Sequence, residues 1–306
     1  MALTMKFAND RMTDPVLQQE RLHHLTRSDR NAWGEQQEEL IRDLCPFPIS
    51  YDVNANQPTN FSEYSYTEFA GGMKLCTQSI DINTRLIKQA AEESNNESYD
   101  ELLEAKWKNI LKDKYKLDRA DTKSYPETVI FLPGNNVLDL MNWELIARVV
   151  LEIDDVMIKP HPLIDEKAAE KIAHKVGWNR IINPNESGMD YLLNAKTIYS
   201  GSVSELTIVG ALYDKKVINL GNFFNECLGA YYPLTRQMFL SDNPKQTILN
   251  VMNCDYSGFI FPWMSPAQVE NRIVKFYNES LRLRKIYSPL YIMPPPPPPP
   301  RKNKGE

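Results

Sequence analysis

Short apolar runs alternate with amphipathic segments along residues 126–220. The runs are rich in Val and Ile, which is typical of buried strands, and each is followed by a segment with apolar residues at helical spacing. The strands predicted from this pattern are 128–132, 156–158, 180–182, 196–199 and 216–220. The helices predicted between and after them are 137–151, 165–176, 188–195 and 203–213.

Strands that alternate with helices require crossover connections, and these produce a parallel sheet with helices on both faces. The sequence therefore predicts an α/β fold, with a Rossmann-like domain over residues 126–290. Open sheets of this kind bind ligands outside the carboxyl ends of their strands. Three unusual segments directly follow predicted strands and would meet at that edge: Pro133-Gly134-Asn135-Asn136, Lys159-Pro160-His161-Pro162 and Ser200-Gly201-Ser202-Val203-Ser204.

The pattern differs in residues 1–125. Helices are predicted over 10–45, 82–93 and 98–116. Asp14-Pro15 and Ser28 are candidate helix starts in the first segment, and apolar residues recur at helical spacing in the last. One short strand is expected at 64–69. We therefore expect a smaller, helix-rich N-terminal domain over residues 1–125.

The end of the chain contains two further helices and a tail. The helices are predicted over 244–252 and from Ser265 to Leu281, and a short strand is predicted at 259–261 between them. Residues 291–306 contain seven consecutive prolines and a short basic stretch. Such a run adopts an extended polyproline helix and packs into no core. We expect a disordered Pro-rich tail that is available to bind a partner.

Composition places the chain among soluble globular proteins. It has 306 residues, 42% hydrophobic and 25% charged, which is enough for two domains. A net charge of −5 lacks the basic excess typical of nucleic-acid binders. The N-terminus lacks the apolar core of a signal peptide, and no window is apolar enough for a membrane span, so we expect a cytoplasmic protein. Four scattered cysteines and four histidines predict no metal site.

The segments at the predicted sheet edge carry the candidate chemistry. Prolines on both sides of His161 stiffen the backbone and hold the imidazole in place. A fixed histidine beside Lys159 suits a diphosphate or a leaving phosphate. Gly201 permits close approach of a ligand, and the hydroxyls and free N–H groups where the next helix begins form an anion site. The pattern predicts electrostatic stabilisation of a departing nucleotide phosphate.

Each of these residues taken alone has a simpler interpretation. A lone His161 is more often an ordinary loop histidine. Ser202 or Ser204 alone is more often a helix cap, with Glu205 near the capping-box position. Asn135 alone is typical of a turn. Their joint occurrence after successive parallel strands is what favours a binding site.

The ordered set of motifs resembles the C-terminal half of capsule-polysaccharide transferases, namely the Kdo transferases and the bacterial sialyltransferases with a His-Pro motif and a serine motif. The matching features are Pro133-Gly134 after a strand, Lys159-Pro160-His161-Pro162, the serines before Glu205, Gly210-Ala211-Leu212, and 215–220. The resemblance covers roughly residues 126–285. It implies a GT-B fold and a metal-independent glycosyltransferase that moves a sugar from a nucleotide-activated donor to an acceptor hydroxyl.

In those families the motif histidine and serines hold the donor phosphate. The resemblance therefore implies a set of donor-binding residues in this chain: His161, Lys159, Ser200, Ser202, Ser204, Glu205, Gly134 and Asn135. It implies no cofactor apart from the nucleotide-sugar substrate, and an acceptor that is a glycan or a modified DNA base. No motif in residues 1–125 matches the families' carboxylate base, so the catalytic residues and the acceptor side of the N-terminal domain are unassigned.

Two other functions fit the same fold. A nucleotide-sugar epimerase would need acid and base carboxylates on both sides of the sugar and would consume the donor without an acceptor. A non-catalytic binding or scaffold protein would keep the fold, bind no nucleotide and recruit partners through the Pro-rich tail.

Overall fold

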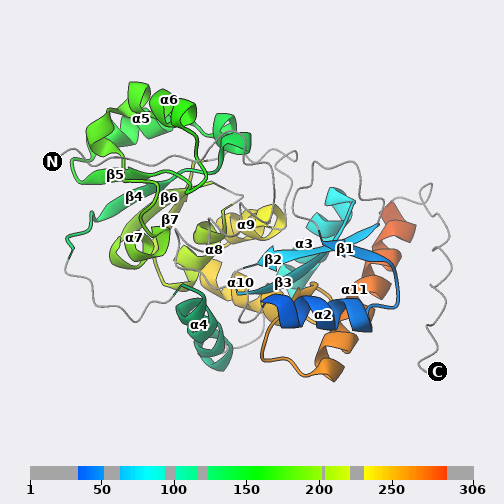
Figure 1. Cartoon of the computed structure of the whole chain (residues 1–306). Coiled ribbons are helices and arrows are strands. Elements are labelled where there is room, and N and C mark those ends of the chain that lie inside the picture. Colours follow the sequence, from blue (N-terminus) through cyan, green and yellow to red (C-terminus); the bar gives the residue numbers. More distant parts are fainter. Residues whose placement is uncertain are drawn as a thin grey trace, which may run out of the picture.

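The chain folds into two sheets joined by helices (Figure 1). One is a four-stranded parallel sheet from the middle of the chain, and the other is a four-stranded mixed sheet. The protein is therefore an α/β protein, as the sequence predicts. The computed structural model describes residues 34–51, 63–69, 71–93, 101–115, 123–201, 204–220 and 231–287.

The parallel sheet has the strand order β5-β4-β6-β7. Phe131 lies opposite Lys159 and Ser200 lies opposite Asn219, so the carboxyl ends of all four strands share one edge. The chain leaves β4 for β5 on one side and returns to β6 on the other, which places the topological switch point between β4 and β6. The strands are β4 (Thr128–Phe131), β5 (Val156–Lys159), β6 (Thr197–Ser200) and β7 (Lys216–Asn219).

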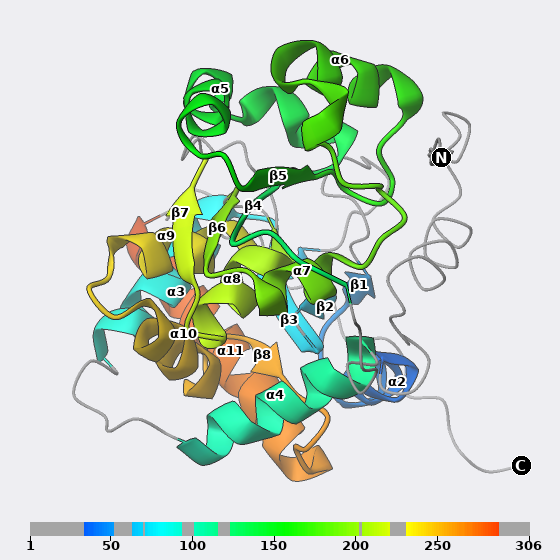
Figure 2. The ribbon, with the colours of Figure 1, turned by 90° about the vertical axis from the view of Figure 1, so that its left-hand side faces the viewer.

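Helices cover both faces of this sheet, as Figure 2 shows. All residues of β4 are buried, and they alternate between the two faces, because Ile130 belongs to the hydrophobic cluster on one face whereas Val129 and Phe131 belong to the cluster on the other. The covering helices are α5 (Trp143–Glu152) and α6 (Glu166–Val176) on the first face, and α7 (Gly188–Asn194) and α8 (Glu205–Leu212) on the second.

Two predictions for this region need correction. The expected helix over 137–151 is divided, because the 3-10 helix η2 (Asn135–Leu140) ends before Asn142, whose side chain accepts a hydrogen bond from Leu145 N and caps α5. The expected strand at 180–182 is wrong. Residues Trp178–Arg180 form the 3-10 helix η3, so only Ile181 is left to pair, through a single parallel bridge to Ile158.

The mixed sheet has the order β1-β2-β3-β8. The predicted strand at 64–69 is confirmed as β2, but a whole sheet was not expected in a helix-rich N-terminal part. The chain turns at Gly71 with a φ of 87° and pairs β3 antiparallel to β2. The bounds are β1 (Ile49–Tyr51), β2 (Tyr64–Phe69), β3 (Gly72–Thr77) and β8 (Phe259–Ile260).

Helices from both ends of the chain pack around the mixed sheet. Helix α3 contacts α9, α10 and α11, and α11 also contacts α2. The domain division expected at residue 125 stays a prediction, and these contacts cross it. The bounds are α2 (Gly34–Leu44), α3 (Ile80–Glu93), α4 (Glu101–Tyr115), α9 (Tyr231–Leu240), α10 (Pro244–Asn253) and α11 (Pro266–Tyr287).

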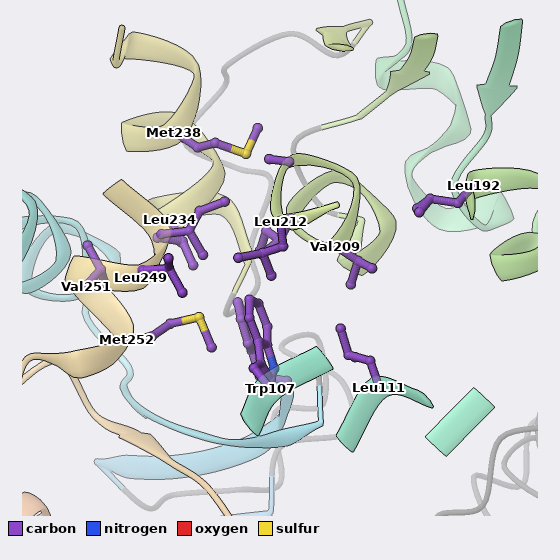
Figure 3. Close-up of a cluster of buried hydrophobic side chains, with 14 of the residues drawn as sticks. Trp107, Leu111, Leu192, Val209, Leu212, Leu234, Met238, Leu249, Val251 and Met252 are labelled. Atoms are coloured by element: carbon purple, nitrogen blue, oxygen red, sulfur yellow. The ribbon is translucent and has the colours of Figure 1, made fainter. Parts of the chain in front are cut away.

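One of the hydrophobic clusters, part of which is drawn in Figure 3, includes residues of both sheets. Trp107 of α4 is fully buried, and it lies among side chains of α8, α9 and α10. The same cluster includes Phe131 of β4 in the parallel sheet and Phe259 of β8 in the mixed sheet. Labelled members in Figure 3 include Leu111, Val209, Leu212, Leu234, Met238, Leu249 and Met252.

Several predictions fall on residues that are not described. The Pro-rich tail over 291–306 and the first part of the predicted helix over 10–45 lie outside the described residues, as does Ser202. Among the residues that are described, no helix has the length and apolar character needed to cross a membrane.

Candidate functional site

Backbone hydrogen bonds tie the carboxyl ends of the parallel strands into one row. Leu132 N donates to Lys159 O at 3.0 Å, and Leu220 N donates to Ser200 O at 2.9 Å. The segments that directly follow β4, β5 and β6 therefore start from the same edge, as predicted. We call the group at this edge the sheet-edge site and define it by Gly134, Asn135, His161, Ser187, Ser200 and Gly201.

The loops after β4 and β5 are linked through Asn135. Its amide Nδ2 donates to Asp165 Oδ2, and the other oxygen of that carboxylate accepts from Ala168 N at 2.6 Å, which caps α6. Gly134 precedes Asn135 as the N-cap residue of η2, with an extended backbone. Asn135 therefore lies beside the segment that follows His161.

The backbone fixes the tautomer of His161. Leu163 N donates to His161 Nδ1 at 3.1 Å, so Nδ1 is the unprotonated nitrogen and the hydrogen of the neutral ring is on Nε2. Burial, together with the nearby Lys159 charge, lowers the pKa of His161 to about 4. At neutral pH the ring is therefore an uncharged donor through Nε2–H.

Lys159 is buried beneath the loop that carries His161. Its Nζ donates to Pro160 O at 2.8 Å and to Pro184 O at 3.1 Å. Burial lowers the pKa of Lys159 to about 7, although Glu186 acts in the opposite direction. Lys159 thus holds two loops together, and its predicted contact with a phosphate stays a prediction.

A glycine and two hydroxyls shape the start of the loop after β6. The buried Ser200 Oγ lies 2.9 Å from Thr207 Oγ1, which also donates to Gly201 O at 2.7 Å. A Cβ added at Gly201 would lie 3.3 Å from Met141 Sδ. Gly201 therefore permits the segment after β4 to approach the segment after β6 at the switch point.

Ser204 and Glu205, two of the predicted donor-binding residues, lie at the start of α8 and differ in their contacts. Ser204 is the N-cap residue of α8, but its side chain makes no capping hydrogen bond. Glu205 is bound by α4, because the hydroxyl of Tyr115 at the end of that helix donates a hydrogen bond to Glu205 Oε1 at 2.5 Å. The structure thus brings Glu205 to α4, and its predicted contact with the ribose or base stays a prediction.

The prediction did not include the loop of residues 183–187, which also lies at this edge because Ile181 pairs with β5. Ser187 is the N-cap residue of α7, and its Oγ is buried with no hydrogen-bond partner among the described residues. The next residue, Gly188, approaches Phe131 and Leu206. Ser187 is therefore near the end of β4 and the start of α8. The sequence feature that could have predicted this loop is Asn183-Pro184-Asn185, a typical turn sequence directly after the apolar pair Ile181-Ile182.

Comparisons with known proteins give no further identification: no family model, curated protein or solved structure matches the chain. Within the described ranges, no three His, Cys, Asp or Glu side chains are grouped as metal ligands. The function is therefore inferred from the sheet-edge site itself.

Proposed function

We propose that the protein is a glycosyltransferase of GT-B type that binds a nucleotide-activated sugar at the sheet-edge site. The observation that carries the proposal is the strand order β5-β4-β6-β7, which creates a switch point flanked by Gly134 and Gly201. Ligands of open α/β sheets bind at such a point. The strands that carry His161 and Ser200 are separated by one strand, or about 10 Å, which suits an extended anion such as a nucleoside diphosphate.

Uncharged donors supply the contacts to the donor's phosphates. His161 offers Nε2–H, and the start of α8 offers backbone N–H groups with the favourable end of the helix dipole. The buried Ser187 hydroxyl is a further group, since a buried polar atom without a partner is rare in folded proteins. These groups support binding of an anion without requiring a metal.

The transfer step follows from this binding mode. An acceptor hydroxyl, of a glycan or of a modified DNA base, loses its proton to a carboxylate base and attacks the anomeric carbon. The bond from that carbon to the phosphate oxygen breaks, and the nucleotide leaves with the electron pair. The donors at the sheet-edge site stabilise the negative charge that develops on the departing phosphate.

Nucleotide binding is the first test. Thermal unfolding is measured with UDP, CMP, CDP and GDP, and we expect one of them to stabilise the protein by about 2.7 kcal/mol at a hundredfold excess over its Kd. His161→Ala should lose this stabilisation, because the ring donates to the phosphate. His174→Ala is the matched control, since His174 is an exposed histidine on α6. If no nucleotide stabilises the protein, the transferase proposal fails and a binding or scaffold role is favoured.

Product analysis then separates transfer from epimerisation. The protein is incubated with the nucleotide sugar whose nucleotide bound, with and without glycan or DNA acceptors. A transferase releases the nucleotide in proportion to the sugar that appears on the acceptor. Conversion of the donor to an isomer without any acceptor would instead identify an epimerase.

A further inference from the structure

A pocket lies between α4 and the start of α11, and none of the sheet-edge residues lines it. It has a volume of about 390 Å³ and is lined by residues of α4, by Asn253 at the end of α10, by Asp255, and by residues of the segment 263–272. Neither the motifs in the sequence nor the proposed donor site includes it. We call it the α4–α11 pocket and define it by Leu103, Lys106, Asn253, Trp263, Gln268 and Asn271.

Trp263 lines the pocket and is the last ring of an aromatic stack. The ring of Trp263 lies parallel to that of Phe261, with centroids 4.5 Å apart and an interplanar angle of 5°. Phe261 is in turn parallel to Phe259, which is fully buried. The indole therefore rests on a fixed support and is half-buried at the pocket. A flat apolar surface of this kind suits the C–H face of a sugar ring.

Amide side chains line the same pocket as Trp263. Gln268 uses its Oε1 to accept a hydrogen bond from Ser265 N at 2.9 Å, which leaves its NH2 group for another acceptor. The side chains of Asn253 and Asn271 make no hydrogen bond to the described part of the chain. Amides provide both donors and acceptors, which is the combination that ring hydroxyls require.

The charges at the pocket leave one available cation. Arg272 is occupied, because it donates to Met252 O at 2.8 Å, Phe259 O at 2.9 Å and Asn253 O at 2.7 Å. Asp255 is paired with Lys275 at 2.6 Å. Lys106 is exposed and forms no ion pair with the described residues. Its neighbours one helical turn away, at 102, 103, 109 and 110, are uncharged.

We propose that the α4–α11 pocket binds a sugar ring that carries a carboxylate, such as a uronic acid unit of a glycan. The ring stacks on Trp263, the amides of Asn253, Gln268 and Asn271 bind its hydroxyls, and Lys106 pairs with the carboxylate. This inference goes beyond the donor site and does not depend on transferase activity, because binding is measured without any nucleotide.

The test compares methyl glucuronide with methyl glucoside by isothermal titration calorimetry and ligand-observed NMR on the full chain. We expect the glucuronide to bind more tightly than the glucoside. Lys106→Ala should weaken glucuronide binding about fivefold and leave glucoside binding unchanged, because one partly screened ion pair is lost. Asn271→Ala should weaken both sugars. Trp263→Ala should abolish binding of both.

Matched controls separate binding from folding. Lys171→Ala removes an exposed lysine of α6 and should leave both affinities unchanged. Lys106 and Asn271 are exposed, so their variants should fold even if Trp263→Ala does not. Failure of both sugars to bind at about 50 mM, a concentration at which weak sugar sites are occupied, would overturn the proposal. So would binding that Lys106→Ala and Asn271→Ala leave unchanged, or binding of uridine in place of the sugars.

Discussion

Burial sets the charge of two neighbouring residues at the sheet edge. Lys159 gains two carbonyl partners but loses water, and its remaining charge acts on His161 across one proline. Both pKa values are lowered, to about 7 for Lys159 and about 4 for His161. The apo site is therefore less positive than the two residue types suggest, and an arriving phosphate supplies the charge that stabilises their protonated forms.

The lowered pKa of His161 predicts a pH-dependent stability. The unfolded chain binds this proton near pH 6.5, whereas the folded protein binds it only near pH 4. The unfolded chain therefore binds more protons than the folded protein between these two pH values. The free energy of unfolding does not depend on His161 above about pH 6.5, and it decreases as the pH falls from there to about 4. We expect a loss on the order of 2 kcal/mol over this window, reduced in His161→Gln, when urea unfolding is followed at several pH values. His174→Gln, which changes an exposed histidine, should keep the wild-type slope.

The lowered pKa of Lys159 predicts that nucleotide affinity decreases as the pH rises, whereas the stability effect of His161 increases with pH. About half of the Lys159 side chains are protonated at pH 7, and a bound anion raises that pKa, so binding takes up a proton. Affinity should therefore fall as the pH rises above 7. Calorimetry in PIPES and in Tris at pH 7 should give binding enthalpies that differ by the number of protons taken up, about half a proton, times the difference between the two buffers' ionisation enthalpies. Equal enthalpies in the two buffers, or an uptake that persists in Lys159→Met, would contradict this assignment.

At the scale of elements, α8 approaches the parallel sheet through a glycine. A Cβ at Gly210 would collide with Ile198 Cδ1 of β6 and lie 3.3 Å from Val217 Cγ2 of β7. Gly in a helix costs about 1 kcal/mol relative to Ala, and the close contact with the sheet offsets that cost. The glycine is therefore required by packing and not by backbone conformation.

A pair of substitutions tests this close contact. Gly210→Ala should destabilise the protein by about 1 kcal/mol, since the collision outweighs the better helix propensity. In an Ile198→Val background, which removes Cδ1, the same change should be neutral or stabilising. The free energy of unfolding in urea is measured for the wild type, both single variants and the double variant. An equal cost of Gly210→Ala in both backgrounds would show that the contact is not the cause.

The elements also show how far the sequence predicts this fold. Strands β4 and β5 are buried at all or nearly all of their positions, and such burial requires short apolar runs that are visible locally. The mixed sheet is different, because β3 pairs with β8 across more than half of the chain, and Lys74 lies opposite Phe259. The pattern of apolar residues within either strand does not indicate which strand it pairs with. The strand predicted at 180–182 failed because Gly177 and η3 turn the backbone before it.

The same distinction holds for the candidate site. Positions directly after parallel strands, such as Gly134, His161 and Gly201, were predictable because topology alone places them at one edge. The partners of these residues were not predictable. Tyr115 is far from Glu205 in the sequence, and Ser187 follows a segment that pairs through one bridge. Contacts of this kind depend on how α4 and α7 pack.

At the scale of the whole molecule, the shared core constrains how the protein unfolds. Trp107 of α4 packs among α8, α9 and α10, which all belong to the later part of the chain, and α11 packs on α2 and α3. A fragment that starts at residue 126 would expose the surfaces that α3 and α4 cover. The N-terminal and C-terminal parts therefore stabilise each other, in contrast to two domains joined only by a linker.

This sharing predicts one cooperative transition for the whole chain. Trp107→Ala should lower the free energy of unfolding by about 3–5 kcal/mol, because it leaves a large cavity where α4, α8, α9 and α10 meet. Tryptophan fluorescence and far-UV circular dichroism should shift together, with equal calorimetric and van't Hoff enthalpies. Trp178→Ala is the control, since Trp178 is 49% exposed and its loss should cost within about 0.5 kcal/mol. Two separate transitions, of which Trp107→Ala moves only one, would mean that the two sheets fold independently and that their common core contributes little to either.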